Sequence, residues 1–245
     1  MNLLISLAIG KHYTNLYNEL FYPSQKNYAN KCGYDFKLID HKLPNTIDHP
    51  DAISFDKILC FCQDWSMQYD KIIFVDADIF INPDSPPIDM VCDDDYISVI
   101  DEWNQPNSTD RIKVQRKMGW ETSATDYYRL AGFDITTTRG INTGVIVANP
   151  KKYGSFFQQI YNTYAQYSPG HPRNFHFEQS AIGYQLQKNN ICKYLDNRYN
   201  AIYAIYKYDN PTVDLVEFVQ NNFFTHFAGK FALDKVCDLN SHYNL

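Results

Sequence analysis

Short apolar runs alternate with longer segments of helical spacing along the first part of the chain. The apolar runs are rich in β-branched and aromatic residues, as is typical of strands, and they cover Asn2 to Ala8, Tyr34 to Asp40 and Lys71 to Val75. Between them, apolar spacing predicts helices over Tyr13–Cys32, broken or kinked by Pro23, and over Ser54–Tyr69. This alternation predicts an α/β fold with a central, mainly parallel, twisted sheet and flanking helices.

The second half of the chain continues the pattern with shorter strands. We expect strands at Tyr96–Ile100, Asn142–Asn149, Cys192–Leu195, Ala201–Ile205 and Asn222–His226, and helices at Tyr153–Tyr167 and Phe177–Asn189. Residues 104–139 are polar with weak periodicity, which predicts a long substrate-facing loop. Since neither an internal repeat nor a linker is evident, the sequence predicts one domain over residues 1–245.

Composition narrows the class of protein. Apolar residues make up 44% of the 245 residues and charged residues 20%, as in a globular protein. The net charge of -6 argues against nucleic acid as a partner, because nucleic-acid binding needs basic surface. The six cysteines show no metal-binding spacing, and no apolar stretch reaches the length of a transmembrane segment, so we expect reduced thiols and a soluble, cytoplasmic protein. Composition leaves the oligomeric state open.

Two carboxylates follow the most strongly apolar run. Lys71 to Val75 is typical of a buried strand, and Asp76-Ala77-Asp78 comes directly after it. Because an unpaired buried carboxylate is costly, we expect Asp76 and Asp78 to emerge into the crevice where open α/β sheets bind their ligands. A bend at the strand end would let both side chains reach one divalent cation. The alternative is a pair of solvated turn residues.

His226 is a third possible ligand, since it ends another apolar run near the end of the chain. Two carboxylates and one imidazole suit Mn²⁺, with Mg²⁺ as the alternative. The competing interpretation is a histidine that is only hydrogen-bonded. Lys230 follows Gly229, which lets the backbone approach closely, so Lys230 is either a phosphate contact or a solvated surface lysine.

Two more acidic stretches could belong either to a functional site or to ordinary helix starts and turns. Glu178 and Gln179 lie at a predicted helix start, where the helix dipole stabilises a carboxylate, although an ordinary first turn favours the same residues. Asp93-Asp94-Asp95 precedes a predicted strand instead of following one. We therefore expect this cluster at the opposite edge of the sheet, as a solvated turn.

Several short stretches, taken together in their order along the chain, indicate a protein family more specifically than any one of them alone. They are Ser6 to Tyr13, Asp56 to Leu59, Phe74 to Asp78, Ile141 to Val145, Glu178 to Ala181 and His226 to Gly229. Their order resembles the metal-dependent glycosyltransferases of the GT-A fold, a Rossmann-like α/β domain. The resemblance is greatest to glycosyltransferase family 8, the glycogenin-like enzymes, and to the related family 34. An Asp-x-Asp motif alone is common, whereas all of these stretches in this order are fairly specific.

The resemblance implies transfer of a sugar from a nucleoside-diphosphate-sugar to a hydroxyl group, with retention at the anomeric carbon. It implies a UDP-sugar as donor and a glycan, glycoprotein or small molecule as acceptor. The implied donor-binding residues are Leu7, Ala8, Ile9, Tyr13, Lys57, Asp76, Ala77, Asp78, Asn142, Thr143, Gly144, Gly229 and Lys230. The implied metal ligands are Asp76, Asp78 and His226, the catalytic residues are Glu178 and Gln179, and the acceptor-binding residues are Asp101, Glu102 and Trp103. Residues of about 1–100 would form a nucleotide-binding half, and residues 101–245 would complete the acceptor and metal sites.

Two positions depart from the family 8 pattern. Ala232-Leu233-Asp234 stands where the pattern has Lys-Pro-Trp, so Lys230 is a stand-in for the phosphate-binding lysine, and Glu178 replaces an Asp. Two other functions stay open at this point. A haloacid-dehalogenase-type phosphatase would use Asp76 as its nucleophile, and a non-catalytic carbohydrate-binding module would explain the aromatic content.

Overall fold

The computed structural model describes residues 1–44, 46–171, 175–230 and 232–245. Within these ranges, six strands form a central sheet in the order β2-β1-β3-β6-β5-β7. The strands are β1 (Asn2–Leu7), β2 (Asp35–Ile39), β3 (Lys71–Val75), β5 (Ile97–Asp101), β6 (Ile141–Ala148) and β7 (Cys192–Tyr194). β1 is parallel to β2 and β3, and β5 is parallel to β7, whereas β6 runs antiparallel to β3 and β5. The predicted α/β fold with a mainly parallel sheet is confirmed.

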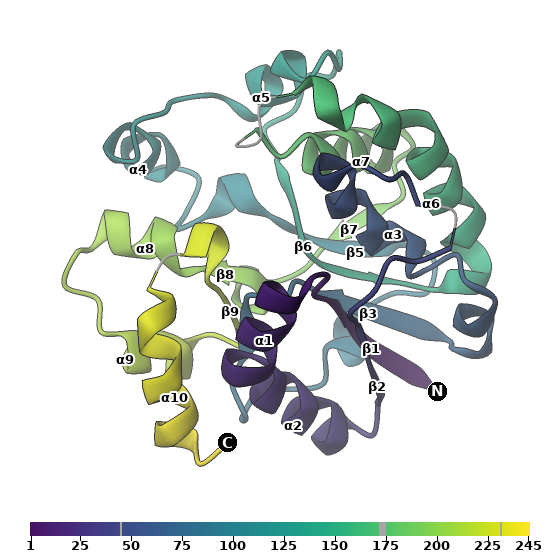
Figure 1. Cartoon of the computed structure of the whole chain (residues 1–245). Helices are drawn as coiled ribbons and strands as arrows, with labels where there is room; N and C mark the ends of the chain where they lie inside the picture. The colour runs from purple at the N-terminus through teal and green to yellow at the C-terminus, as the bar shows by residue number, and fades with distance from the viewer. Residues whose placement is uncertain (45, 172–174, 231) are drawn as a thin grey trace.

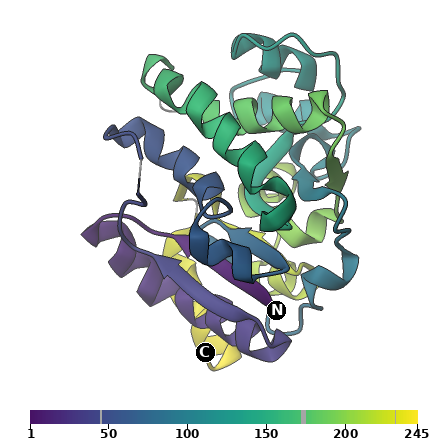
Figure 2. The same ribbon diagram turned by 90° about the vertical axis from the view of Figure 1, so that its right-hand side faces the viewer.

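Helices cover both faces of this sheet (Figures 1 and 2). One face carries α1 (Lys11–Leu20) and α2 (Tyr22–Cys32), and the other carries α3 (Asp56–Leu59), α6 (Pro150–Tyr164) and α7 (Phe177–Lys188). Two helices lie between β5 and β6 in the chain, α4 (Arg111–Lys117) and α5 (Ala124–Leu130). The remaining α-helices of the described ranges are α8 (Tyr203–Asp209), α9 (Leu215–Asn221) and α10 (Val236–Tyr243), and α10 packs on α1.

Successive side chains of the central strands enter different cores, because a strand points alternate residues to opposite faces. Ile72 and Phe74 of β3 pack in the core that includes α3, α6 and α7. Ile73 and Val75 pack on the other side, against α2 and the smaller sheet. Burial on both faces explains why Lys71 to Val75 is continuously apolar instead of alternating.

A second sheet contains three strands in the described ranges, β4 (Ile79–Ile81), β9 (Phe224–His226) and β8 (Ala201–Ile202), in the order β4-β9-β8. β4 is antiparallel to β9, with Ile79 opposite His226. β8 is parallel to β9, with Ile202 opposite His226. The chain passes from β3 to β4 through Asp76-Ala77-Asp78, so the small sheet carries His226 to the Asp-x-Asp turn.

The structure corrects several predicted elements. Ser54–Tyr69 is not one helix, because 3-10 turns at Pro50–Phe55 and Asp64–Gln68 flank α3. The hydroxyl of Ser66, in the second of these turns, donates to the Cys60 carbonyl at 2.7 Å. The strand predicted at Ala201–Ile205 ends at Ile202, where α8 begins. Residues 104–139 contain α4 and α5 instead of a continuous loop, because side chains such as Val114 are buried.

The break at Pro23 is confirmed, since α1 ends at Leu20 and Pro23 lies in the first turn of α2, where its missing N–H costs no hydrogen bond. β4 was not predicted, and neither was the antiparallel direction of β6. Both depend on pairing with distant strands, which local periodicity does not encode.

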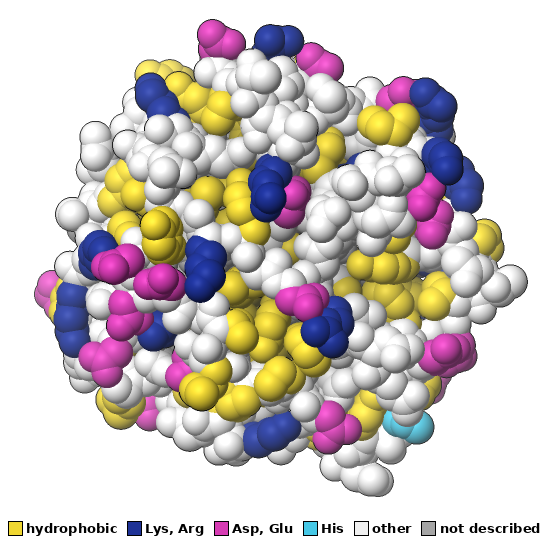
Figure 3. Space-filling view, turned by 180° about the vertical axis from the view of Figure 1, so that it is seen from behind, with side chains coloured by type: hydrophobic (Ala, Val, Ile, Leu, Met, Phe, Trp, Pro, Cys, Tyr) yellow, Lys and Arg dark blue, Asp and Glu magenta, His cyan; other side chains and the backbone are white. Residues whose placement is uncertain are grey.

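The surface charges, the helices and the cysteines can be compared with the predictions made from composition. On the face in Figure 3, acidic and basic side chains are interspersed. Among the helices of the described ranges, none combines the length and apolar character needed to cross a bilayer. All six cysteines are free. The single domain, the cytoplasmic location and the lack of a nucleic-acid partner stay predictions.

Candidate active site

Several ends of the central strands meet at one edge of the sheet. β1 and β3 are parallel, so Ala8 and Asp76 follow them at the same edge. β6 runs in the opposite direction, which places its first residues there too: the Asp76 N–H donates to the Gly144 carbonyl at 2.8 Å. β5 is antiparallel to β6 and therefore ends at this edge with Asp101. The reversed β6 thus completes the crevice that the Asp-x-Asp position predicts.

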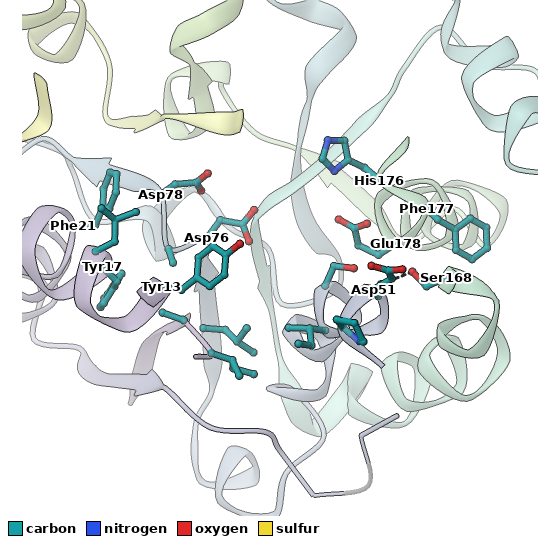
Figure 4. Close-up of a pocket in the computed structure, with 18 of the residues that line it drawn as sticks. Tyr13, Tyr17, Phe21, Asp51, Asp76, Asp78, Ser168, His176, Phe177 and Glu178 are labelled. Carbon is teal, nitrogen blue, oxygen red and sulfur yellow. Dashed lines mark hydrogen bonds between the residues drawn. The ribbon is translucent and has the colours of Figure 1, made fainter. Parts of the chain in front are cut away.

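A cavity of about 620 Å³ opens at this edge (Figure 4). Its lining includes the residues after β1, the Asp-x-Asp turn and the start of α7: Leu7, Ala8, Ile9, Tyr13, Asp76, Ala77, Asp78, His176, Phe177 and Glu178. Figure 4 shows the carboxylates of Asp76 and Asp78 on one side of the cavity and that of Glu178 on the other. The structure therefore brings together the stretches predicted to hold the nucleoside, the metal and the reacting sugar.

Asp76, Asp78 and His226 form a compact cluster. One oxygen or nitrogen atom from each lies within 4.8 Å of the others. The His226 Nε2 atom is 3.1 Å from Asp78 Oδ1, and the Phe227 N–H donates to the Asp78 carbonyl at 2.9 Å. The residues predicted as metal ligands are thus neighbours, and two carboxylates with one imidazole are a donor set that suits Mn²⁺ or Mg²⁺.

The charges in this cluster are matched. Burial acts to raise the pKa of Asp78, but the charge and hydrogen bond of His226 outweigh it and hold that pKa below its usual value. Burial acts to lower the pKa of His226, and Asp78 outweighs it and raises that pKa. Burial raises the pKa of Asp76 in spite of the opposing charge of Lys57. Each carboxylate therefore faces a cationic group of the chain.

Lys57 forms a buried ion pair with Asp76. Its Nζ atom lies 3.0 Å from Asp76 Oδ1 and 3.3 Å from Thr143 Oγ1, and the residue is 7% exposed. Burial acts to lower the pKa of Lys57, but the carboxylates of Asp76 and Glu178 outweigh it and raise the pKa. The lysine is therefore a fixed positive charge next to the Asp-x-Asp motif.

Glu102 connects three elements around the same crevice. Its Oε2 atom accepts hydrogen bonds from Asn142 Nδ2 at 3.0 Å and from Gln179 Nε2 at 3.2 Å. Its Oε1 atom accepts from Arg111 Nη2 at 2.6 Å. Burial acts to raise the pKa of Glu102, but Arg111 and the Asn142 hydrogen bond hold it below its usual value. Glu102 is therefore an ionised acceptor that ties β6 and α7 to α4.

The remaining predicted residues have other contacts. Asp101 Oδ1 accepts the backbone N–H groups of Trp103 at 3.1 Å and Gly140 at 3.2 Å, so it shapes the turn after β5. None of Asp101, Glu102 and Trp103 is among the described residues that line the cavity, and their acceptor role stays a prediction. Gly229 has a φ of 72°, which favours glycine. The side chain of Lys230 lies outside the described part of the chain.

Buried polar residues that sequence reasoning missed support the site. Gln25 is fully buried, and its Nε2 atom donates to the carbonyls of Asp76 at 3.3 Å and Ile79 at 2.9 Å, which holds the Asp-x-Asp turn. Asn200 lies against His226, with Oδ1 2.8 Å from Nδ1. Only Gln25 gave a signal, because it occupies the helical phase of the buried Tyr28 and Ala29.

A comparison of the sequence with protein families agrees with this geometry. Residues 52–231, more than half of the chain, match the model of glycosyl transferase family 8. The chain belongs to glycosyl transferase family 8. The match covers the Asp-x-Asp turn, the start of β6, the first turn of α7 and the end of β9. The curated proteins contain no match to the chain.

Solved structures show the fold of this family 8 protein. A glycosyltransferase involved in the glycosylation of the major capsid of PBCV-1 is similar with a TM-score of 0.61 at 16% identity, over 98% of each chain. The galactosyltransferase LgtC, in complex with donor and acceptor sugar analogs, is similar with a TM-score of 0.57 at 12% identity, over 99% of this chain and 96% of LgtC. The chain is thus a glycosyltransferase of the GT-A fold, as the sequence predicts.

Proposed function

We propose that this glycosyltransferase uses a divalent cation to transfer a sugar from a UDP-sugar to a hydroxyl acceptor, with retention at the anomeric carbon. The observation that carries the proposal is the convergence of Asp76, Asp78 and His226, of which Asp76 and Asp78 line a cavity of about 620 Å³. Cleavage of the glycosyl–phosphate bond leaves negative charge on the diphosphate. An acidic protein needs cationic groups at that point to stabilise it.

Asp76, Asp78 and His226 would hold Mn²⁺ or Mg²⁺, since hard carboxylate oxygens and an imidazole fit both ions. The ion, when bound, would act as a Lewis acid on the diphosphate. Lys57 adds a second positive charge, 3.0 Å from Asp76, that is held in place by burial. Family 8 membership and the arrangement of these side chains support this assignment.

The other predicted donor residues have positions that suit their proposed roles. Leu7, Ala8, Ile9 and Tyr13 line the cavity beyond β1 and would bind the nucleoside. Asn142, Thr143 and Gly144 lie at the start of β6, next to the Asp-x-Asp turn, where the donor sugar would bind. Gly229 and Lys230 follow β9, close in sequence to His226, and would approach the diphosphate.

Glu178 and Gln179 would act at the anomeric carbon. Glu178 lines the cavity in the first turn of α7, and Gln179 is 9% exposed and bound to Glu102. A carboxylate here would stabilise the positive charge that develops on the sugar ring. Asp101, Glu102 and Trp103, at the end of β5, would lie on the acceptor side, and the acceptor would be a glycan, a glycoprotein or a small molecule.

Calorimetry with UDP in the presence and absence of Mn²⁺ tests this proposal. We expect UDP to bind with the metal and to lose most of its affinity without it. A screen of donor hydrolysis across UDP-, GDP- and dTDP-sugars then identifies the nucleotide, and the anomeric configuration of the product decides retention. UDP binding that ignores Mn²⁺ would contradict metal dependence, and preferential hydrolysis of another nucleotide-sugar would contradict the UDP assignment.

The two alternative functions predict different outcomes in these assays. A haloacid-dehalogenase-type phosphatase would form a trapped phosphoryl group on Asp76. A non-catalytic carbohydrate-binding module would bind free glycan without UDP. Family 8 membership favours the transferase over both.

A further inference from the structure

We propose that Asn200 is a positioning residue that fixes the tautomer of His226, through a directed chain of hydrogen bonds that begins at Glu102. The inference concerns four side chains, Glu102, Asn142, Asn200 and His226, and rests on the proposed metal-binding role of His226. We call these four residues the amide relay. It would keep the Nε2 atom of His226 available on the side of Asp78.

The direction of the relay is set at Glu102. An ionised carboxylate only accepts hydrogen bonds, so the atom of Asn142 that lies 3.0 Å from Glu102 Oε2 is the amide nitrogen. On the other side of the same amide, the backbone N–H of Gly144 lies 2.9 Å from Asn142 Oδ1 and only donates. Two neighbours of opposite character therefore fix the orientation of the Asn142 amide.

The orientation of Asn142 fixes the orientation of the Asn200 amide, which in turn decides whether the Nδ1 atom of His226 carries a proton. Because Asn142 Oδ1 accepts, the Asn200 atom 2.7 Å away is the donor Nδ2. The Oδ1 atom of Asn200 then faces His226 Nδ1 at 2.8 Å. A carbonyl oxygen needs a donor at that distance, so Nδ1 carries a proton. The other ring nitrogen, Nε2, lies 3.1 Å from Asp78 Oδ1 and donates to that carboxylate, so Nε2 is the nitrogen that would give up its proton to a bound cation while Nδ1 keeps its own.

Asn200 is held rigidly enough to keep its carbonyl oxygen against the Nδ1 atom of His226. It is fully buried, in the turn that leads into β8, and β8 pairs with β9 next to His226. Its carbonyl accepts from Gln105 Nε2 at 2.9 Å, and Gln105 Oε1 accepts the Ile202 N–H at 2.9 Å. Flipping the Asn200 amide would place two acceptors or two donors against each other. In a buried site such a flip would lose both hydrogen bonds.

The relay makes the donor-sugar side and the metal side of the crevice interdependent. Groups that orient a metal-binding imidazole typically change metal affinity about 10–100-fold when they are removed. We expect a loss of this size from Asn200, although Asn200 would contact neither the ion nor the sugar.

The tautomer itself is measurable without any metal. Long-range ¹H–¹⁵N spectra of the metal-free protein show which ring nitrogens of His226 carry protons. We expect a proton on Nδ1, as well as on Nε2, in the wild-type protein and loss of the Nδ1 proton in Asn200→Leu, which removes both relay bonds. In Asn200→Asp, a carboxylate oxygen still accepts from Nδ1–H, so this variant should keep the wild-type tautomer.

Titration with Mn²⁺ alone gives the second measurement. Asn200→Leu should bind Mn²⁺ about 10–100-fold more weakly than the wild type, whereas Asn200→Asp should bind at least as tightly as the wild type. Asn82→Leu is the matched control. Asn82 is also a buried asparagine beside the small sheet, and its Nδ2 donates to the carbonyls of Val219 at 2.9 Å and Asn222 at 3.2 Å. This variant should lose thermal stability and keep both the tautomer and the Mn²⁺ affinity.

Unchanged ring protonation and Mn²⁺ affinity in Asn200→Leu would overturn the relay, and so would a wild-type ring that carries a proton at Nε2 alone. An equal loss of affinity in Asn82→Leu would show that general destabilisation explains the effect, which also overturns it. Failure of the wild-type protein to bind Mn²⁺ would instead refute the metal site of the proposed function. The spectra of the metal-free protein would still decide the tautomer in that case.

Discussion

Gly144 lies directly against the imidazole ring of His226. A Cβ atom built on Gly144 would come 2.7 Å from His226 Cε1 and 2.9 Å from His226 Nδ1, closer than real Cβ contacts allow. The same Cβ would also meet Asn142 Oδ1 at 2.9 Å. The glycine at the start of β6 therefore makes room for the ring that reaches Asp78.

Gly144→Ala should displace His226 and weaken Mn²⁺ binding about 10-fold or more, because the ring is packed and hydrogen-bonded on its other sides. Overpacking should also lower the unfolding free energy by about 1–3 kcal/mol. Mn²⁺ calorimetry and urea denaturation measure the two effects. Gly154→Ala is the control, since its Cβ would meet the Phe61 carbonyl oxygen at 2.8 Å, far along the chain from His226. Equal Mn²⁺ affinities in the two variants would contradict the role of Gly144.

Asp78→Asn should lower the transfer rate at least about 100-fold, because the amide removes a charge that the proposed cation needs. We expect little loss of folding, since an amide oxygen can still accept from His226. The assay is sugar transfer at saturating Mn²⁺, with thermal unfolding beside it. Asp93→Asn is the control, because Asp93 lies in the exposed turn before β5. Near-normal turnover in Asp78→Asn would refute the metal assignment.

The sequence was sufficient for the parts of the site that depend on local pattern. The apolar run before Asp76 predicted a buried strand that ends at Val75, and the structure ends β3 there. The position of His226 after an apolar run predicted a strand end, although its contact with Asp78 required pairing of β4 with β9, which lies far along the chain. The family resemblance supplied that contact where periodicity did not.

The buried polar residues that support the site could not be predicted from the sequence, for a different reason. Asn200 and Arg111 are polar residues in polar stretches, and their complete burial follows from how distant segments pack. The sequence predicted a loop at residues 104–139 and missed α4, because the buried face of α4 is formed partly by Arg111, a charged side chain. Hydrophobic periodicity reports apolar burial alone, so buried hydrogen-bond networks escape it.

Arg111→Met tests the buried pair that orients Glu102. Arg111 is 1% exposed, bonds Glu102 at 2.6 Å, and lies 5.0 Å from the ring of Trp103 and 5.3 Å from that of Trp120. Removing the cation leaves a buried carboxylate unpaired, so we expect a loss of about 3–5 kcal/mol in the unfolding free energy. The double variant Arg111→Met/Glu102→Gln should recover part of it, since a neutral amide needs no cation.

The loss in Arg111→Met should depend on pH. Because the folded-state pKa of Glu102 is lowered, the pair stabilises the protein above the unfolded-state pKa of about 4.3 and ceases to do so as the pH falls. The difference between wild type and variant should therefore shrink in acid, which urea denaturation at several pH values measures. Arg116→Met, which breaks an exposed pair with Glu121, should change the unfolding free energy far less, because solvent screens that pair. A difference that does not vary with pH would contradict the ionised state of Glu102.

The buried carboxyl group of Asp56 should make the unfolding free energy depend on pH in the opposite direction. The residue is 1% exposed, and among the described residues neither carboxylate oxygen makes a well-formed hydrogen bond, although the nearby Tyr161 hydroxyl partly opposes the effect of burial on the Asp56 pKa. Burial raises its pKa to about 7. Between about pH 4 and that value, the folded protein keeps a proton that the unfolded chain releases. The unfolding free energy should therefore fall as the pH rises through this range, by up to about 1.4 kcal/mol per pH unit, and level off above it.

Asp56→Asn should remove this part of the pH dependence, because an amide does not titrate. Urea denaturation of the two proteins at a series of pH values measures the slopes, with the variant less sensitive to pH. Asp64→Asn, at an exposed position in the turn after α3, should keep the wild-type slope. If Asp56→Asn and the wild type lose stability equally as the pH rises, another buried group carries the proton. The Asp56 carboxyl group would then be ionised in the folded protein, in contact with a donor.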